Sequence, residues 1–192
     1  MTDMKKKRLV VAILLVASMS SAVMAGRRHP VEHPVPGLAP FGEAILLTFP
    51  SLDGQGNLSV PFAVDVQDVS VDGQPAVLGA YVVRIKFDPK SVSFVAVDAD
   101  NDPYFSARPY FTAAEKANAQ GWVRITAVQL SAQQPIGMVH VARAQFRELS
   151  PGGAETVRAE MESASSALVK DSEGKFIRTL HIDVKENEDS LP

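Results

Sequence analysis

The chain of 192 residues contains no cysteine, so it forms no disulfide bond and offers no thiolate to a metal ion. A domain without such cross-links depends on burial of apolar surface, and a domain of about 150 residues buries about 70% of its unfolded surface, which is sufficient. Tryptophan occurs once and tyrosine three times, so few rings are available to stack on sugars. The net charge of −3 argues against nucleic acid as a partner, because binding to nucleic acid requires dense positive charge.

Motifs of the common catalytic sites are also missing. The chain has no glycine-rich phosphate loop and no G-x-S-x-G nucleophile elbow, and no paired carboxylates or nucleophile–base pair stand out. The string H-x-x-E-H at residues 29–33 resembles a zinc protease motif, but that motif needs a helix, which Pro30 and Pro34 prevent. The string S-x-x-K at residues 172–175 falls in a predicted turn. We predict no catalytic residue, no cofactor and no metal site.

An acidic segment at residues 98–102 (DADND) keeps one alternative to this prediction open. It places side-chain oxygens at alternate positions, as the start of a calcium loop does. An EF-hand loop then needs glycine at its sixth position and glutamate at its twelfth, where this chain has Pro103 and Pro109. A solvated acidic turn is the preferred interpretation of Asp98 to Asp102, and a calcium site at the end of a strand is the alternative.

Residues 1–25 contain the three parts of a secretory signal peptide. Basic residues 5–8 (KKKR) precede an apolar run at residues 9–17, and a small, polar segment then ends in Val-Met-Ala at Ala25. A transmembrane anchor, the alternative, needs about 20 apolar residues, and no later stretch approaches that length either. We expect cleavage after Ala25 and a secreted or periplasmic protein without a membrane anchor.

The remaining chain divides into a spacer, one domain and a tail. Residues 26–40 (GRRHPVEHPVPGLAP) contain four prolines, which favour an extended, Pro-rich spacer. Residues 41–185 are long enough for a single domain. Residues 186–192 form a charged tail that we expect to fray.

The domain is predicted to be all-β. Residues 79–87 (GAYVVRIKF) alternate apolar and charged side chains, which places Val83, Ile85 and Phe87 on a buried face. Residues 176–184 place Leu180 and Ile182 on a similar face. Further strands are predicted at residues 58–68, 92–98, 122–130, 137–149 and 156–161, and Pro61 in the first of these suggests an edge strand or a bulge. Short turns join these strands, and only residues 112–120 favour a helix, so an antiparallel β-sandwich is expected.

One predicted loop contains the candidate contact residues Tyr104, Phe105, Arg108 and Tyr110. Exposed apolar side chains that cluster in this way usually mark a contact surface. The alternative is that the rings close one end of the sandwich, and the sequence does not favour either interpretation. Trp122 begins an amphipathic strand, which favours a position in the core or at its rim.

The order and spacing of these strands resemble those of the cohesin domain. In residues 78–98, a strand that begins with glycine ends in F-D-P, and a turn then leads into V-x-F-V-x-V. Residues 121–130, 137–149 and 167–184 parallel the closing strands of the family, including a D-x-x-G turn. The resemblance spans residues 58–184. It implies a jelly-roll β-sandwich related to cellulose-binding modules, with binding of dockerin modules through one sheet face.

We therefore expect an exported, non-catalytic, cohesin-like binding module. Its expected ligand is a protein partner, dockerin-like or other, and the resemblance links it to polysaccharide degradation. The first alternative is a carbohydrate-binding module with a polysaccharide as its ligand, in which Tyr104, Tyr110 or Trp122 would stack on sugar rings. The second alternative is a secreted hydrolase.

Overall fold

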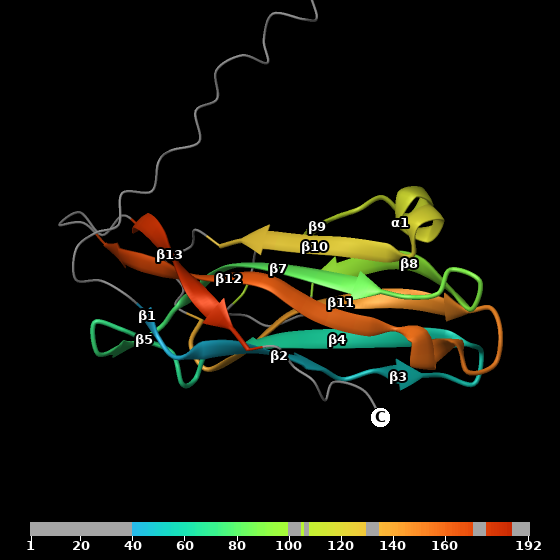
Figure 1. Cartoon of the computed structure of the whole chain (residues 1–192), viewed down its shortest axis with the longest axis horizontal. Coiled ribbons are helices and arrows are strands. Elements are labelled where there is room, and N and C mark those ends of the chain that lie inside the picture. The colour runs from blue at the N-terminus through green and yellow to red at the C-terminus, as the bar shows by residue number, and fades with distance from the viewer. Residues whose placement is uncertain (1–39, 100–104, 106–107, 130–134, 171–175, 186–192) are drawn as a thin grey trace, which may run out of the picture. The chain divides into compact units, whose positions relative to one another are not determined.

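The computed structural model describes residues 40–99, 105, 108–129, 135–170 and 176–185. In chain order, the elements of this part of the chain are β1 (Pro40–Phe41), β2 (Glu43–Thr48), β3 (Ser51–Leu52), β4 (Asn57–Asp65), β5 (Ser70–Val71), β6 (Gln74–Pro75), β7 (Leu78–Lys86), β8 (Val92–Ala99), β9 (Tyr110–Phe111), α1 (Ala114–Gln120), β10 (Trp122–Val128), β11 (Met138–Glu148), the 3-10 helix η1 (Gly153–Thr156), β12 (Arg158–Lys170) and β13 (Phe176–Val184). Figure 1 shows the long strands running alongside one another, with α1 at one end of β10.

The strands form a sandwich of two sheets. The first sheet has the order β8-β11-β4-β2, with β3 also paired to β4, and the second has the order β13-β12-β7-β10-β9. All pairs within these sheets are antiparallel, whereas β2 and β13 pair in parallel and join the two sheets. The predicted all-β, jelly-roll sandwich is confirmed, with a correction at this one pair of described strands. Parallel neighbours require a long connection, so strand spacing along the chain does not reveal such a pair.

Strand β7 contributes the predicted face to the core. Val83 and Ile85 are fully buried, and Phe87, directly after the strand, is almost so. The ring of Phe87 meets that of Phe146 from β11 edge-on, with the ring centroids 5.3 Å apart. Because β7 and β11 belong to different sheets, this ring pair lies in the interior of the sandwich.

In β13, the side chains with described burial, residues 180–184, are less deeply buried than those of β7. The predicted core residue Ile182 is fully buried, whereas Leu180 is half buried and packs against the margin of the core. Strand β13 lies between β12 and its parallel partner β2. The prediction of Leu180 as a core residue therefore holds only in this weaker sense.

Pro61 was predicted to mark an edge strand or a bulge. The first alternative is wrong, whereas a register shift does occur close by, where His140 and Ala142 of β11 pair with the successive residues Ala63 and Phe62 of β4. Pro61 lies in β4, which is an inner strand between β2 and β11. Strand β2 ends at Thr48 and β3 begins at Ser51, and the amide of Phe49 between them donates to the Pro61 carbonyl (2.9 Å). Both main-chain groups of a strand residue point to the same side, so the missing N–H of Pro61 faces this interruption between two partner strands.

The sequence prediction missed strand β2 and the hairpin of β5 and β6. Strand β2 is apolar on both sides, because Ala44 and Leu46 are buried while Ile45 and Leu47 are half buried, so it shows no alternation. The hairpin turns at Asp72-Gly73, where both residues have positive φ (52° and 70°), as a type I′ turn requires. Its strands have only two residues each, too few to show a pattern.

The buried side chain of Tyr81 in β7 carries an unsatisfied polar group. Its ring packs against those of Phe62 (6.1 Å between centroids) and Phe105 (5.4 Å). Its hydroxyl is buried, and no partner for it is present among the described residues. Burial raises the pKa of Tyr81, because the phenolate would lose its hydration.

Replacing Tyr81 with phenylalanine is expected to raise the free energy of unfolding by about 1 kcal/mol, because the buried donor disappears while the ring remains. The unchanged protein also loses stability as the pH rises above about 10, where Tyr81 ionises in the unfolded chain but not in the folded one. The variant should lack this part of the alkaline loss. Urea unfolding near neutral pH and at alkaline pH measures both effects. A variant less stable than its parent would show that the hydroxyl has a stabilising partner.

Candidate functional site

The structure describes only part of the predicted contact loop, and Tyr104 lies outside the described residues. Phe105 is 1% exposed and packs on the ring of Tyr81, so it is a core residue with almost no surface to offer a partner. Arg108 and Tyr110 are both exposed, and Tyr110 is 78% exposed. Arg108 and Tyr110 therefore stay predicted contact residues, and Phe105 is reassigned to the end of the core.

Tyr110 belongs to a larger surface, the outward side of β12, β7, β10 and β9, which we call the outer face. The side chains of this face alternate with the buried residues of each strand, and the register sets them side by side. Its rows are Tyr110, Thr126, Val82 and Ser163; Arg124, Arg84 and Glu160; Trp122, Lys86 and Arg158; and Val128, Ala80 and Ser165.

One half of the outer face is charged, and Arg84 is at its centre. The guanidinium of Arg84 lies over the indole ring of Trp122, 5.0 Å from the ring centroid, which is a cation–π arrangement. Arg84 also forms an ion pair with Glu162. Beside it, the Nζ of Lys86 donates to Glu160 at 2.7 Å. These contacts hold long side chains in one geometry on an exposed sheet.

A β-bulge brings Glu162 into this charged half. In the pairing of β12 with β7, Met161 and Ser163 face successive residues of β7, so Glu162 has no partner opposite it. A bulge of this kind changes the direction of a side chain. Glu162 lies between Arg84 and Arg124, with Arg124 Nε 2.7 Å from its carboxylate, and its side chain is only 18% exposed. The two arginines are thus fixed relative to each other through one carboxylate.

The other half of the outer face is made of small and apolar side chains. Ala80, Val82 and Thr126 are half buried, whereas Val128 is 53% exposed. These side chains are short and uncharged. The outer face therefore combines an area of short, uncharged side chains with an adjacent set of fixed charges and with the exposed ring of Tyr110.

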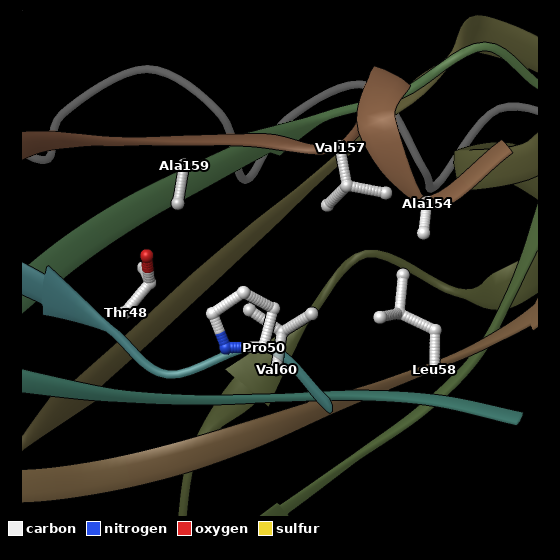
Figure 2. A pocket seen from close by; sticks show the side chains of 7 residues that line it. All are labelled: Thr48, Pro50, Leu58, Val60, Ala154, Val157 and Ala159. Carbon is white, nitrogen blue, oxygen red and sulfur yellow. The ribbon is translucent and has the colours of Figure 1, made fainter. Parts of the chain in front are cut away.

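The described residues were compared with the requirements of a metal site and of a membrane span. They contain no group of three or more His, Cys, Asp or Glu side chains able to hold a metal ion. No helix in this part of the chain is long and apolar enough to cross a membrane. Figure 2 shows a pocket that lies between the two sheets, and its lining carries no charged group: Thr48, Pro50, Leu58, Val60, Ala154, Val157 and Ala159.

Two carboxylates have lowered pKa values, and both belong to turns. Hydrogen bonds from the side chain and main chain of Asn57 lower the pKa of Asp53. The main-chain amide of Lys90 and the hydroxyl of Ser91 lower the pKa of Asp88, in the turn that the sequence predicted after β7. These shifts reflect turn formation and do not indicate catalysis. Asp98 is exposed and accepts from Gln145 (3.3 Å), and residues 100–102 of the calcium alternative are not described.

The sequence analysis did not identify the outer face as a site. Its signal was present, since Arg84 and Lys86 alternate with buried residues. Arg158 and Glu160 alternate with the half-buried Ala159 and Met161. Which strands lie next to β7 could not be read from that alternation. Trp122, expected in the core or at its rim, lies half buried on the outer face at the start of β10, with the guanidinium of Arg84 over its ring.

No protein-family model and no curated protein matches this chain. Solved structures similar to it are cohesin modules. The cohesin module of a family 33 glycoside hydrolase from Clostridium perfringens is 11% identical, covers 76% of this chain and 92% of that chain, and gives a TM-score of 0.48. The seventh ScaB type I cohesin from Pseudobacteroides cellulosolvens is 12% identical over 74% of this chain and 86% of that chain, with a TM-score of 0.46.

A third similar structure is that of the complex between the OlpA cohesin and a dockerin from Clostridium thermocellum. It is 11% identical, covers 74% of this chain and 94% of that chain, and has a TM-score of 0.47. With identities of 11–12% and TM-scores below 0.5, these similarities identify no individual residue of the outer face.

Proposed function

We propose that this protein is an exported, non-catalytic binding module whose outer face docks a protein partner. The observation that carries the proposal is the composition of that face. Arginine, tyrosine and tryptophan dominate the binding energy of protein interfaces, and the outer face presents Arg84, Tyr110 and Trp122 on neighbouring strands. Side chains already fixed on a rigid sheet lose little entropy when a partner docks.

The partner in this proposal is a protein, dockerin-like or other. One of the similar structures is of a cohesin bound to a dockerin, and the sequence resemblance implies the same kind of ligand. Through that partner, the module would serve polysaccharide degradation outside the cytoplasm. The short side chains around Val82 allow a partner to approach the sheet closely. The charged half supplies orientation, because ion pairs at an interface fix register more than affinity.

The arrangement favours a protein ligand over a sugar or a hydrolysed substrate. Stacking on a sugar needs a free ring face. Arg84 occupies one face of Trp122, so among the described candidates only the ring of Tyr110 is fully open to a sugar. Hydrolysis of a glycoside needs an acid and a second carboxylate on either side of a cleft. Glu160 and Glu162 lie on an open sheet, and each is in an ion pair with a basic side chain.

The experiment compares two double variants with similar substitutions at different places on the surface. Tyr110→Ala with Val128→Arg alters two exposed residues of the outer face, whereas Phe41→Ala with Val95→Arg alters residues of nearly equal exposure in β1 and β8. Proteins exported by the source organism are passed over the immobilised parent, and the retained protein is purified. We expect at least a tenfold loss of affinity, about 1.4 kcal/mol or more, for the outer-face variant alone.

Calorimetric titration measures this difference, and the thermal midpoints of both variants should stay close to that of the parent. Equal loss in both variants, or none in the outer-face variant, would contradict docking at this face. Loss of binding to insoluble polysaccharide in the outer-face variant would replace the protein-binding proposal with the carbohydrate-binding alternative.

Export has its own test. The signal peptide predicts a mature N-terminus at Gly26, directly after the small residues that end at Ala25. Mass spectrometry of the protein from the periplasm or the medium should give a chain that begins at Gly26. An intact Met1 in the membrane fraction would instead show that residues 9–17 anchor the protein.

A further inference from the structure

Among the described strands, β8 lies at the edge of the first sheet, and its sequence is association-prone. It pairs with β11 on one side and ends the first sheet. Residues 92–97 (VSFVAV) are uncharged, rich in β-forming side chains, and free of proline and glycine. Segments of this composition pair readily with copies of themselves when they lie on an open edge. Proteins usually protect such edges with lysine or proline, and residues 92–97 contain neither.

The side chain of Asn118 occupies part of this edge. Its Oδ1 accepts from the amide of Phe94 at 2.7 Å, and its Nδ2 donates to the carbonyl of Phe94 at 3.0 Å. The two bonds reproduce the contacts that a neighbouring strand would make. Since both main-chain groups of Phe94 point away from β11, they are the groups an added strand would use first.

The β8 edge is also distorted directly after Phe94, the residue that Asn118 binds. The register of β8 against β11 shifts after Phe94, so Val95 has no partner in β11 and its side chain is 54% exposed. A bulge twists an edge and interrupts regular pairing. Val95 is nonetheless apolar, so the bulge by itself leaves an exposed apolar side chain at the edge.

Asn118 is held in place by the packing of α1. Ala117 is fully buried, and the helix ends at Gly121, whose carbonyl accepts from the amide of Phe87 at 2.9 Å. On its other side, the helix contacts the second sheet through Gln120, whose Nε2 donates to the carbonyl of Trp122 (2.9 Å). In Figure 1, α1 lies at the end of the sandwich where β8 and β10 are close to it.

We propose that the β8 edge is a self-association surface and that the amide of Asn118 keeps it closed. The occupant that it excludes is a second copy of this chain. Two identical edges pair antiparallel about a two-fold axis. If the main-chain groups of Phe94 were free in both copies, the two β8 strands would pair and form a closed dimer with one continuous sheet. The clamp thereby confines partner binding to the faces of the sandwich.

The test removes the amide and keeps the helix. Asn118→Leu has nearly the same size and a better helix propensity, but it cannot bond to Phe94. We expect this variant to double its apparent mass in sedimentation equilibrium, while the parent stays monomeric at the same concentration. The exchange rate of the Phe94 amide, measured at a concentration where the variant is monomeric, should rise at least tenfold. Gln120→Leu is the matched control, since it removes an amide from the same helix away from β8, and it should stay monomeric.

A rescue separates edge pairing from general destabilisation. Val95→Lys places a charge on the exposed edge, so the double variant Asn118→Leu, Val95→Lys should return to the monomer. A folded Asn118→Leu variant that stays monomeric overturns the proposal, and so does association that Val95→Lys does not suppress. If Asn118→Leu does not fold, Asn118→Ser is read in the same way. In the unchanged protein, hydrogen exchange of the Phe94 amide at the rate of an unstructured amide would show that Asn118 does not protect this amide.

Discussion

Replacement of Phe87 by alanine is expected to lower the free energy of unfolding by about 3–5 kcal/mol. Phe87 lies directly after β7 and is 6% exposed, and its ring packs edge-on against Phe146 in the other sheet. Truncation removes buried apolar surface and leaves a cavity between the two sheets. The sheets cannot close this cavity, because strand pairing and turns fix the strands in place. The amide of Phe87 also donates to Gly121 at 2.9 Å, so the main chain is held in position after truncation.

Urea unfolding of the variant and parent at the same pH measures this change. The matched control is Phe41→Ala, the same truncation at a residue of β1 that is 79% exposed, and its effect should stay within about 0.5 kcal/mol. A loss of less than about 1 kcal/mol for Phe87→Ala would mean that the assigned buried face of β7 is wrong.

Replacement of Gly42 by alanine is expected to lower the free energy of unfolding by about 2–5 kcal/mol, because two unfavourable effects coincide. Gly42 joins β1 to β2 with a φ of 100°, which side chains rarely tolerate. A Cβ added there would overlap the carbonyl oxygen of Asp68 and would lie 3.0 Å from its carbonyl carbon. Both atoms belong to the main chain, so no side-chain rotation relieves the overlap, and the small sheet of β1, β5 and β6 must shift.

Two other glycines separate these effects. Gly73, in the turn between β5 and β6, has a φ of 70° and open space around it, so Gly73→Ala carries the conformational cost alone, about 1 kcal/mol. Gly54 has open space and no positive φ, so Gly54→Ala should be neutral or slightly stabilising. Thermal or urea unfolding should therefore rank the variants Gly54, Gly73 and Gly42 in order of increasing loss. An equal loss for Gly42 and Gly73 would contradict the overlap with Asp68.

The local order of the domain could be predicted because strands have a two-residue period. Residues with a regular alternation, such as Val83 and Ile85, were placed correctly on the buried face without knowledge of any neighbour. Where that signal is absent, prediction failed: β2 is apolar on both sides, and β5 and β6 are too short. Pro61 suggested an edge strand because proline has no N–H to donate. In the structure, this missing N–H faces the break between β2 and β3, two short strands that pair in succession with β4.

The candidate site depended far more on contacts between distant segments. The sequence grouped Phe105 with Tyr110 because they are close along the chain, yet Phe105 closes the core and Tyr110 is exposed on a sheet. It gave no reason to group Arg84, Trp122 and Glu162, which come from three strands and meet only when β12, β7 and β10 pair. Glu162 reaches the arginines through a bulge, and a bulge depends on the register of two strands.

By itself, the sequence determined the class of this protein: a cysteine-free chain with a signal peptide pattern and a β-sandwich whose strands alternate buried and exposed residues. These properties follow from composition and from a local period, which act within a few residues. Only the tertiary structure decided which strands are neighbours, that β2 pairs with β13, and that Asn118 closes the edge at Phe94. The physical reason is that the main-chain N–H and C=O groups of a strand can form hydrogen bonds with any other strand, so they do not select a neighbour. The choice among partners is made by the packing of the whole core and by the order in which the chain crosses it.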